Sequence, residues 1–230
     1  MSVRLRVAPA GGTEATVIPL RHGLDPRSAL AEVGWHDPTY LRAARPSGEP
    51  GVVVIDVEAS PGEAVAADEP AATAADPALE IAAGEVAVPH QRLAAYAVVV
   101  EEGAVLLTQL SERVHLVPGW WNLPGGGVDP GEDPVDGVVR EVWEETDQRL
   151  EPGELIDVHT QHWLGRAPSG VLEDFQAIRL IFAGRVRQPT EPVIHDVGGS
   201  TAQARWVPQA ELDDLPLVQT IALLRQAGRL

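Results

Sequence analysis

The chain has 230 residues, enough for one sizeable domain and a smaller one, and its composition is that of an ordinary globular protein. Its formal net charge is −17, without a basic stripe of the kind that neutralises nucleic-acid phosphates, so no nucleic-acid partner is expected. Cysteine is absent, which excludes disulfides and cysteine-ligated zinc, and no apolar run is long enough for a membrane span or signal peptide. We therefore expect a cytoplasmic protein with no membrane partner.

The first 57 residues mix short segments of alternating polarity with one helical pattern. Strands are predicted at 3–7, 16–20 and 52–57, and a helix at 26–33. Residues 1–57 therefore form a small α+β or β-rich domain in this interpretation, and its role is unknown.

The middle of the chain differs in texture from the C-terminal part. Residues 58–91 are rich in Ala, Pro and Glu and contain no Lys or Arg, which predicts an acidic linker with a short helix at 77–83. From residue 92 to 230 the pattern becomes regular and predicts one larger domain. Its first two strands, 93–100 and 104–110, form a hairpin. Further strands are predicted at 155–163, 175–184 and 202–207, and a final helix at 216–227.

A well-marked helix is predicted after residue 132. Asp133 can accept hydrogen bonds from the free backbone N–H groups as N-cap, and Pro134 suits the first helical position. Valines at helical spacing predict a side that faces the core. Glu141, Glu144 and Glu145 share an adjoining face, because positions i, i+3 and i+4 are neighbours on a helix.

Three carboxylates within one turn repel one another, by about a few tenths of a kcal/mol per pair. A cation at this face would explain the arrangement, since Mg²⁺ prefers carboxylates and substrate phosphates as ligands. The alternative is a solvated acidic helix face. The glycine run 125–127 favours the cation, because glycine lets a ligand approach the backbone closely, and Glu132 adds another carboxylate.

The segment 126–148 follows the pattern G-x5-E-x7-R-E-U-x-E-E-x-G-U, where U is a bulky apolar residue. The matching residues are Gly126, Glu132, Arg140, Glu141, Val142, Glu144 and Glu145. The segment resembles the Nudix box, and the likeness extends over about residues 92–230. It implies an α/β fold, a Nudix-type α/β/α sandwich with a mixed sheet, beside the small N-terminal domain.

Two residues at the end of the box depart from the family pattern. Asp147 stands where the family has glycine, and we expect it to serve as a left-handed C-cap at some energetic cost. Gln148 stands where the family has an apolar residue, and we expect a packing difference at the helix exit. Neither change removes a carboxylate, so stability should be affected more than catalysis.

The resemblance implies hydrolysis of a phosphoanhydride bond with Mg²⁺ as cofactor, or Mn²⁺ as the alternative ion. Glu144 and Glu145 would be direct metal ligands, and the carbonyl of Gly125 would be a third. Gly126 and Trp121 would contact the substrate. For Trp121 the alternative is an ordinary core position, since tryptophan on a strand is often buried.

Catalysis would centre on Glu141, which would bind a second metal or position the attacking water. Arg140 would hold Glu141 by a charge-assisted hydrogen bond, and Glu132 would act through water or by bracing the arginine. Family members often take a general base or another ligand from outside the box. The candidates here, each with an ordinary surface residue as the alternative, are Glu173, Asp174, Glu191, His195 and Asp196.

The substrate is inferred by elimination. Markers of the coenzyme A, NADH, ADP-ribose and dinucleoside polyphosphate subfamilies are missing or incomplete around 106–110 and 161–165. We therefore expect a small-molecule nucleotide of the MutT type, a nucleoside triphosphate or a nucleoside-diphosphate-linked compound. The alternatives are ADP-ribose or another nucleotide sugar, and, from a different class, a nucleotide-sensing binding module with the same fold.

The N-terminal region offers two further hypotheses. Residues 1–57 could serve in homodimerisation. Arg21-His22-Gly23 also resembles the RHG motif of histidine phosphatases, in which the histidine accepts phosphate. Such a domain needs well over 100 residues, so a chance match is the favoured interpretation.

Overall fold

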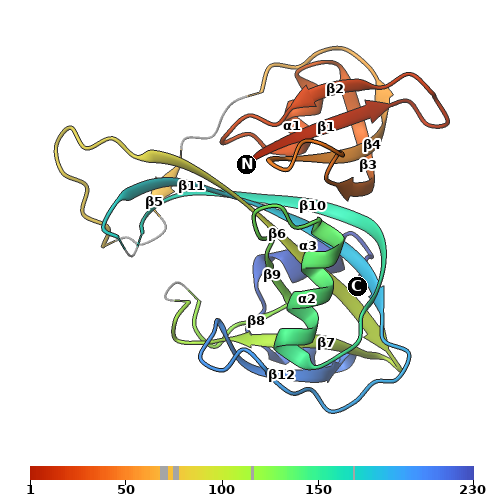
Figure 1. The fold of residues 1–230 in the computed structure, drawn as a ribbon, viewed down its shortest axis with the longest axis vertical. Coiled ribbons are helices and arrows are strands. Elements are labelled where there is room, and N and C mark those ends of the chain that lie inside the picture. The colour runs from red at the N-terminus through yellow and green to blue at the C-terminus, as the bar shows by residue number, and fades with distance from the viewer. Residues whose placement is uncertain (68–71, 75–77, 115–116, 168) are drawn as a thin grey trace. The chain divides into compact units, whose positions relative to one another are not determined.

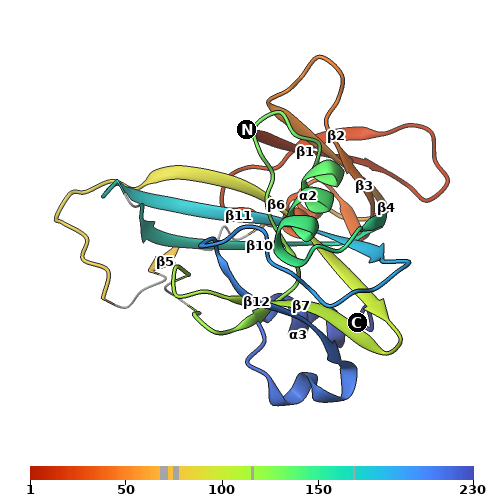
Figure 2. The ribbon, with the colours of Figure 1, turned by 60° about the horizontal axis from the view of Figure 1, so that its bottom comes forward.

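A computed structural model describes the chain except for residues 68–71, 75–77, 115–116 and 168. The chain forms two compact units, each built from two segments. Unit 1 comprises Met1–Ala94 and Asp157–Leu180, and unit 2 comprises Ala95–Ile156 and Ile181–Leu230. Three long strands contribute residues to both units and run side by side (Figure 2); they are β6 (Val88–Glu101), β10 (Glu151–Arg166) and β11 (Leu172–Arg185).

The N-terminal part of unit 1 is a mixed sheet with strand order β2-β1-β4-β3 (Figure 1). Its strands are β1 (Ser2–Ala8), β2 (Thr16–Pro19), β3 (Trp35–Ala44) and β4 (Val52–Pro61). Strand β1 pairs parallel with β4 and antiparallel with β2. Alternate residues of β1, namely Val3, Leu5 and Val7, are buried, as the period of two predicts.

The edge strand β3 is not indicated by the sequence pattern. It contains Pro38 and irregular pairing with β4, and Asp37 adopts a positive φ of 50°. Proline and bulges are tolerated at sheet edges, where one row of backbone groups needs no partner. The pattern of alternation is broken by these residues, so the strand could not be recognised.

Helix α1 (Pro26–Ala31) begins as predicted, with the side chain of Asp25 accepting hydrogen bonds from the N–H groups of Arg27 and Ser28. It ends two residues before the predicted residue 33. Ala29 and Leu30 are buried and attach the helix to the core of unit 1.

The expected linker 58–91 contains parts of three strands. Strand β4 runs to Pro61, β6 begins at Val88, and the two-residue strand β5 (Thr73–Ala74) pairs parallel with β10. The division into residues 1–57, 58–91 and 92–230 stays a prediction.

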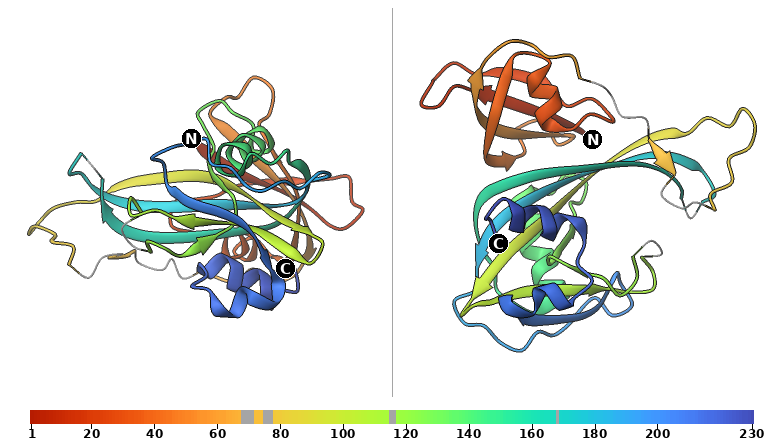
Figure 3. Two further views of the ribbon diagram at one scale, coloured as in Figure 1. Left: turned by 90° about the horizontal axis from the view of Figure 1, so that it is seen from below. Right: turned by 180° about the vertical axis from the view of Figure 1, so that it is seen from behind.

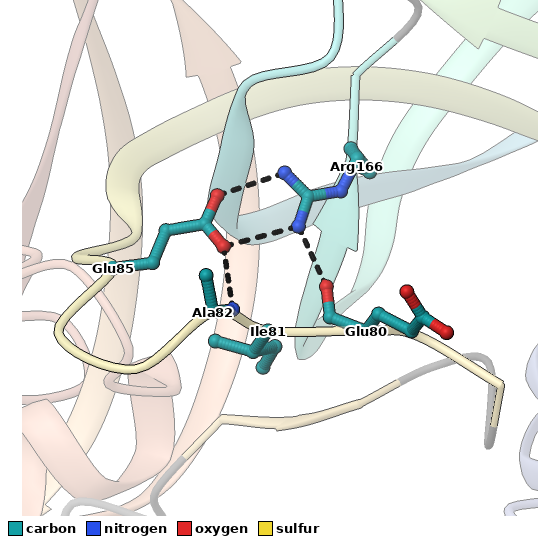
Figure 4. A pocket seen from close by; sticks show the side chains of 5 residues that line it. All are labelled: Glu80, Ile81, Ala82, Glu85 and Arg166. Carbon is teal, nitrogen blue, oxygen red and sulfur yellow. Dashed lines mark hydrogen bonds and ion pairs between the residues drawn. The ribbon is translucent and has the colours of Figure 1, made fainter.

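The short helix predicted at 77–83 is wrong for residues 78–83, which form turns and irregular backbone; Pro77 lies outside the described residues. Arg166 explains the difference, because its guanidinium binds the carbonyl of Glu80 at 2.7 Å and the carboxylate of Glu85 at 2.8 Å. These contacts border an open pocket lined by Glu80, Ile81, Ala82, Glu85 and Arg166 (Figure 4). The backbone here is held by a side chain instead of by helical hydrogen bonds.

The larger sheet has the order β12-β7-β6-β11-β10-β5 among the described residues, with β8 paired to β7 and β9 paired to β6. The strands of unit 2 not yet given are β7 (Ala104–Leu110), β8 (Trp121–Asn122), β9 (Gly125–Gly127) and β12 (Thr201–Pro208). The predicted β6–β7 hairpin is confirmed. Glu102 and Gly103 both have positive φ, 50° and 80°, as the favoured type of two-residue hairpin turn requires.

Helices α2 (Pro134–Thr146) and α3 (Gln219–Gln226) cover opposite faces of the strands of unit 2 (Figures 1 and 3). Ile221 and Leu224 of α3 lie in one core cluster with Leu107 and Trp121. A 3-10 helix, Gln209–Asp214, precedes α3. The α/β class with a mixed sheet and a separate N-terminal α+β region is thereby confirmed. No helix among the described residues is both long and apolar enough to cross a membrane.

The final helix starts three residues later than its predicted start at 216. The backbone N–H of Trp121 donates to the carbonyl of Pro216 at 2.8 Å, and Val218 donates back to Trp121 at 3.0 Å. Residues 216–218 are therefore held in extended pairing with β8, which the local pattern of apolar residues could not indicate.

Candidate functional site

The helix that carries the glutamates has the ends that the sequence predicts. Asp133 caps its start by accepting from the N–H of Val135 at 3.0 Å, and Pro134 occupies the first turn. At its end Asp147 adopts the left-handed conformation with φ 58°, and its N–H donates to the carbonyl of Trp143 at 2.8 Å. The expectation that Asp147 serves as a left-handed cap is confirmed.

Arg140 is the centre of a network of charged hydrogen bonds. Its guanidinium forms a two-pronged pair with Glu132, at 2.8 and 3.0 Å, and donates to Glu141 at 2.9 Å and to Glu144 at 3.0 Å. It also donates to the carbonyl of Gly127 at 3.0 Å. The hydrogen bonds to Glu132, and then the one to Glu141, raise the pKa of Arg140 above its ordinary value despite partial burial. The expected Arg140–Glu141 bond and the bracing of Arg140 by Glu132 are both present.

Glu145 occupies a different environment, on the inner side of the helix. Its side chain is 6% exposed, and burial raises its pKa to about 7. Two hydrogen bonds oppose this shift: the hydroxyl of Thr201 donates to Oε1, and the N–H of Gly125 donates to Oε2 at 2.9 Å. The charges of Glu141 and Asp196 raise the pKa further.

The glycine loop permits this packing at two positions. At Gly126 a Cβ would lie 2.5 Å from Oε2 of Glu141, so the missing side chain makes room for that carboxylate. At Gly125 φ is 139°, and a Cβ would lie 2.2 Å from the backbone oxygen of Ala95 on β6. Glycine is therefore needed at 126 to make room for a carboxylate of the site, and at 125 to let the backbone pass close to β6.

Thr201 was not among the residues singled out from the sequence. It is the first residue of β12, buried, and 56 positions from the glutamate that it binds. A threonine at a strand start carries no local signal of such a contact. Only the pairing of β12 with β7, which is non-local, brings it to the helix.

A segment following Thr190 runs along the end of α2. The N–H of His195 donates to the carbonyl of Glu144 at 2.7 Å, and its ring lies 2.8 Å from Asp147 and stacks on Trp143. Gln148 is buried and exchanges two hydrogen bonds with Thr190, at 3.0 and 3.1 Å. Both departures from the family pattern therefore have polar partners in one segment.

The acidic candidates outside the box have different surroundings. Glu173 contacts His90 at 2.9 Å, and Asp174 contacts His162 at 2.5 Å; all four residues belong to unit 1, whereas the box belongs to unit 2. Glu191 is exposed in the segment beside α2, in unit 2.

The suggested role of Trp121 in stacking on the substrate is corrected by the structure. Its ring is 4% exposed within the core cluster, and the guanidinium of Arg205 lies 5.1 Å from its centroid. Both surroundings keep a nucleobase from reaching the ring face. Trp120, its neighbour, is 41% exposed.

The donor set fits a hard divalent cation. Glu141, Glu144, Glu145 and the loop carbonyls offer oxygen atoms, the type of ligand that Mg²⁺ and Mn²⁺ prefer. Burial raises the pKa of Glu141, although the hydrogen bond and charge of Arg140 lower it in part. Crowded carboxylates with raised pKa values would be stabilised by an added positive charge.

The comparison with protein families defines the class of this chain. The model of the NUDIX domain matches residues 90–225, more than half of the chain, so the chain belongs to the Nudix family. The resemblance drawn from the box is thereby confirmed.

Curated relatives share parts of this chain. Human 8-oxo-dGDP phosphatase NUDT18 is 32% identical over 136 residues, which cover 56% of this chain and 38% of that protein. A MutT-like protein of Streptomyces ambofaciens is 41% identical over 70 residues, covering 30% of this chain and 42% of that one. The RNA pyrophosphohydrolase of Rhodopseudomonas palustris is 36% identical over 109 residues, covering 41% and 59%. The chain spans less than two thirds of the length of each.

Solved structures also resemble the chain. A MutT protein from Methanosarcina mazei Go1 gives a TM-score of 0.45 at 26% identity, covering 63% of this chain and 97% of that one. A MutT Nudix hydrolase from Burkholderia pseudomallei gives a TM-score of 0.43 at 26% identity, covering 60% and 97%.

Proposed function

We propose that the chain hydrolyses a phosphoanhydride bond in a nucleotide, with a divalent cation, Mg²⁺ or Mn²⁺, held by Glu144, Glu145 and the carbonyl of Gly125. The observation that carries this proposal is the network in which Arg140 orients Glu141 beside the glycine loop. A bare acidic helix face would not need an arginine bonded to three carboxylates, nor a fourth carboxylate buried beneath them.

Each side chain of the site has a distinct task in this proposal. A bound Mg²⁺ neutralises the diphosphate and makes a coordinated water more acidic. Glu141 orients the attacking water and accepts its proton; burial raises the pKa of Glu141, which makes it a better base near neutral pH. Arg140 keeps that carboxylate in one orientation, so less reorganisation is needed during the reaction.

The buried position of Glu145 supports its assignment as a ligand. Each carboxylate oxygen can accept two interactions, so the bonds from Thr201 and Gly125 leave lone pairs free. These two donors fix the carboxylate before any ligand arrives. Glu144 is more exposed and is held on the open side by Arg140.

The substrate class is suggested by the names of the relatives. They include an 8-oxo-dGDP phosphatase, an RNA pyrophosphohydrolase and a nucleoside triphosphatase of Escherichia fergusonii. Two of these names specify nucleoside di- or triphosphates and one specifies RNA; the former two support a nucleoside triphosphate or nucleoside-diphosphate-linked substrate for this chain. ADP-ribose or another nucleotide sugar is the alternative.

The test is phosphate release from a panel of nucleoside triphosphates, nucleoside diphosphates, ADP-ribose and dinucleoside polyphosphates in the presence of Mg²⁺. We expect Glu144→Gln and Glu145→Gln to lower kcat by about 100-fold or more, because each removes an anionic ligand. Glu154→Gln, an exposed glutamate on β10, is the matched control and should keep full activity. Hydrolysis that survives EDTA, or that both site variants retain, would overturn the proposal. Tight nucleotide binding without turnover would instead support the sensing module.

A further inference from the structure

A second group of metal-ligating side chains lies in unit 1. His22 precedes α1, His162 lies on β10 and Asp174 lies on β11, and one ligand atom from each falls within 4.8 Å of the others. Nε2 of His162 lies 2.5 Å, and Nε2 of His22 3.3 Å, from the same oxygen of Asp174. Two imidazoles and one carboxylate around a common point match the ligand preferences of Zn²⁺ and leave a fourth tetrahedral position for water.

The side chain of the buried Gln176 holds this group together through two hydrogen bonds to the backbone of the loop. Gln176 accepts the N–H of Gly23 at 3.0 Å and donates to the carbonyl of Leu24 at 2.8 Å, which fixes the loop that carries His22 against β11. Gly23 itself has φ +82°, and a Cβ there would lie 3.0 Å from the ring of His162. Glycine at this position lets the loop come close to the histidine.

The hydrogen bonding of the group is incomplete without an added cation. Nε2 of His22 is buried and forms no hydrogen bond with any described residue, although Asp174 lies 3.3 Å away. A neutral nitrogen there either presents a lone pair to an anionic oxygen or carries a proton without an acceptor in line. A cation between the three side chains removes both costs, because it accepts lone pairs from the imidazoles and the carboxylate together.

We propose that His22, His162 and Asp174 form a Zn²⁺ site separate from the Nudix box. It joins the loop before α1 to strands β10 and β11 and so fastens two distant parts of the sequence within unit 1. The box offers oxygen ligands, whereas this site offers two nitrogens, so the two sites select different metals. The site does not depend on the proposed hydrolysis.

The experiment uses the full-length chain, stripped with EDTA and dialysed against Zn²⁺ in excess Mg²⁺, which occupies the all-oxygen site. We expect one Zn²⁺ bound per chain by elemental analysis. His22→Gln or His162→Gln should weaken Zn²⁺ binding by about 100-fold. Loss of a residue that only hydrogen-bonds to a metal ligand already costs about 10–100-fold in affinity, and loss of the ligand itself should cost at least as much. His90→Gln is the matched control: His90 also contacts a strand β11 carboxylate, Glu173, at 2.9 Å but lies outside the group, and it should keep the metal.

Co²⁺ in place of Zn²⁺ gives a second readout. The visible absorption of four-coordinate Co²⁺ should appear in the wild-type chain and in His90→Gln and be lost in His162→Gln. Asp174→Asn, which preserves shape, replaces any histidine variant whose circular dichroism shows unfolding. The proposal is overturned if no Zn²⁺ is retained, or if His22→Gln and His162→Gln retain as much Zn²⁺ as the wild-type chain; loss of Zn²⁺ in Glu145→Gln would then assign the metal to the box. None of these readouts uses hydrolysis, so they stand apart from failure of the proposed activity.

Discussion

Replacing Gly126 with alanine should remove most activity while the fold remains. The added Cβ would lie 2.5 Å from Oε2 and 2.6 Å from Cδ of Glu141, where ordinary contacts begin at 3.4 Å. The carboxylate must therefore move by about 1 Å, and a misplacement of about 1 Å in a catalytic group costs about 100-fold in rate. Since Arg140 holds the same carboxylate at 2.9 Å, the shift also weakens that bond.

The stability of the Gly126→Ala chain should change little. The group that must move is the end of a flexible side chain, so the steric cost is small. Alanine also restricts the unfolded chain, which stabilises the fold by about 0.4–1 kcal/mol and offsets part of a weakened charged hydrogen bond of about 1.5–3 kcal/mol. We expect a net loss of about 2 kcal/mol or less, measured by thermal unfolding, beside a loss of about 100-fold in kcat.

The neighbouring glycine should respond in the opposite way. A Cβ at Gly125 would lie 2.2 Å from the backbone oxygen of Ala95, and its φ of 139° is unfavourable for any other residue. Backbone atoms cannot move aside cheaply, so we expect Gly125→Ala to destabilise the chain by about 3 kcal/mol or more. Gly51→Ala, where a Cβ meets nothing within 4 Å, controls for the substitution itself.

Full activity in Gly126→Ala would refute the placement of Glu141 at the reaction centre.

Two further predictions concern buried groups. Burial raises the pKa of Glu145 to about 7, and Thr201→Val removes a hydrogen bond that opposes this shift. More of the carboxyl is then protonated at pH 7, so the Mg²⁺ concentration for half-maximal rate should rise about tenfold at pH 7 and by less at pH 9. Thr201→Ser, which keeps the hydroxyl, should restore the wild-type value. Burial also raises the pKa of Tyr40 above 10, and its hydroxyl has no hydrogen-bond partner among the described residues. The unfolded chain therefore loses this proton at a lower pH than the folded chain, so wild-type stability should fall as pH rises above 10. Thermal unfolding measured at alkaline pH should show a shallower fall for Tyr40→Phe. Equal slopes of stability against pH in the two proteins would contradict this account.

The parts of the site that could be predicted from the sequence are those set by local physics. Capping by Asp133, the left-handed turn at Asp147 and the shared face of the glutamates depend on residues within a few positions of one another. Strand β3 and the contact of Thr201 with Glu145 depend on pairing between distant segments. The buried state of Glu145 belongs to the same class, because helical spacing alone does not distinguish it from the half-buried Glu144.

The two departures from the family pattern show how such distant contacts affect the site. Asp147 binds His195, and Gln148 binds Thr190, so both polar replacements hold the same segment against α2. The same segment also binds the backbone carbonyl of Glu144, which accepts hydrogen bonds from the N–H groups of His195 and Asp196 at 2.7 and 3.2 Å. As a result Asp196 lies close enough to Glu145 for its charge to raise the pKa of that carboxyl. A glycine and an apolar residue at the helix exit would not supply these bonds, so the two replacements hold the segment that carries Asp196 against the end of α2.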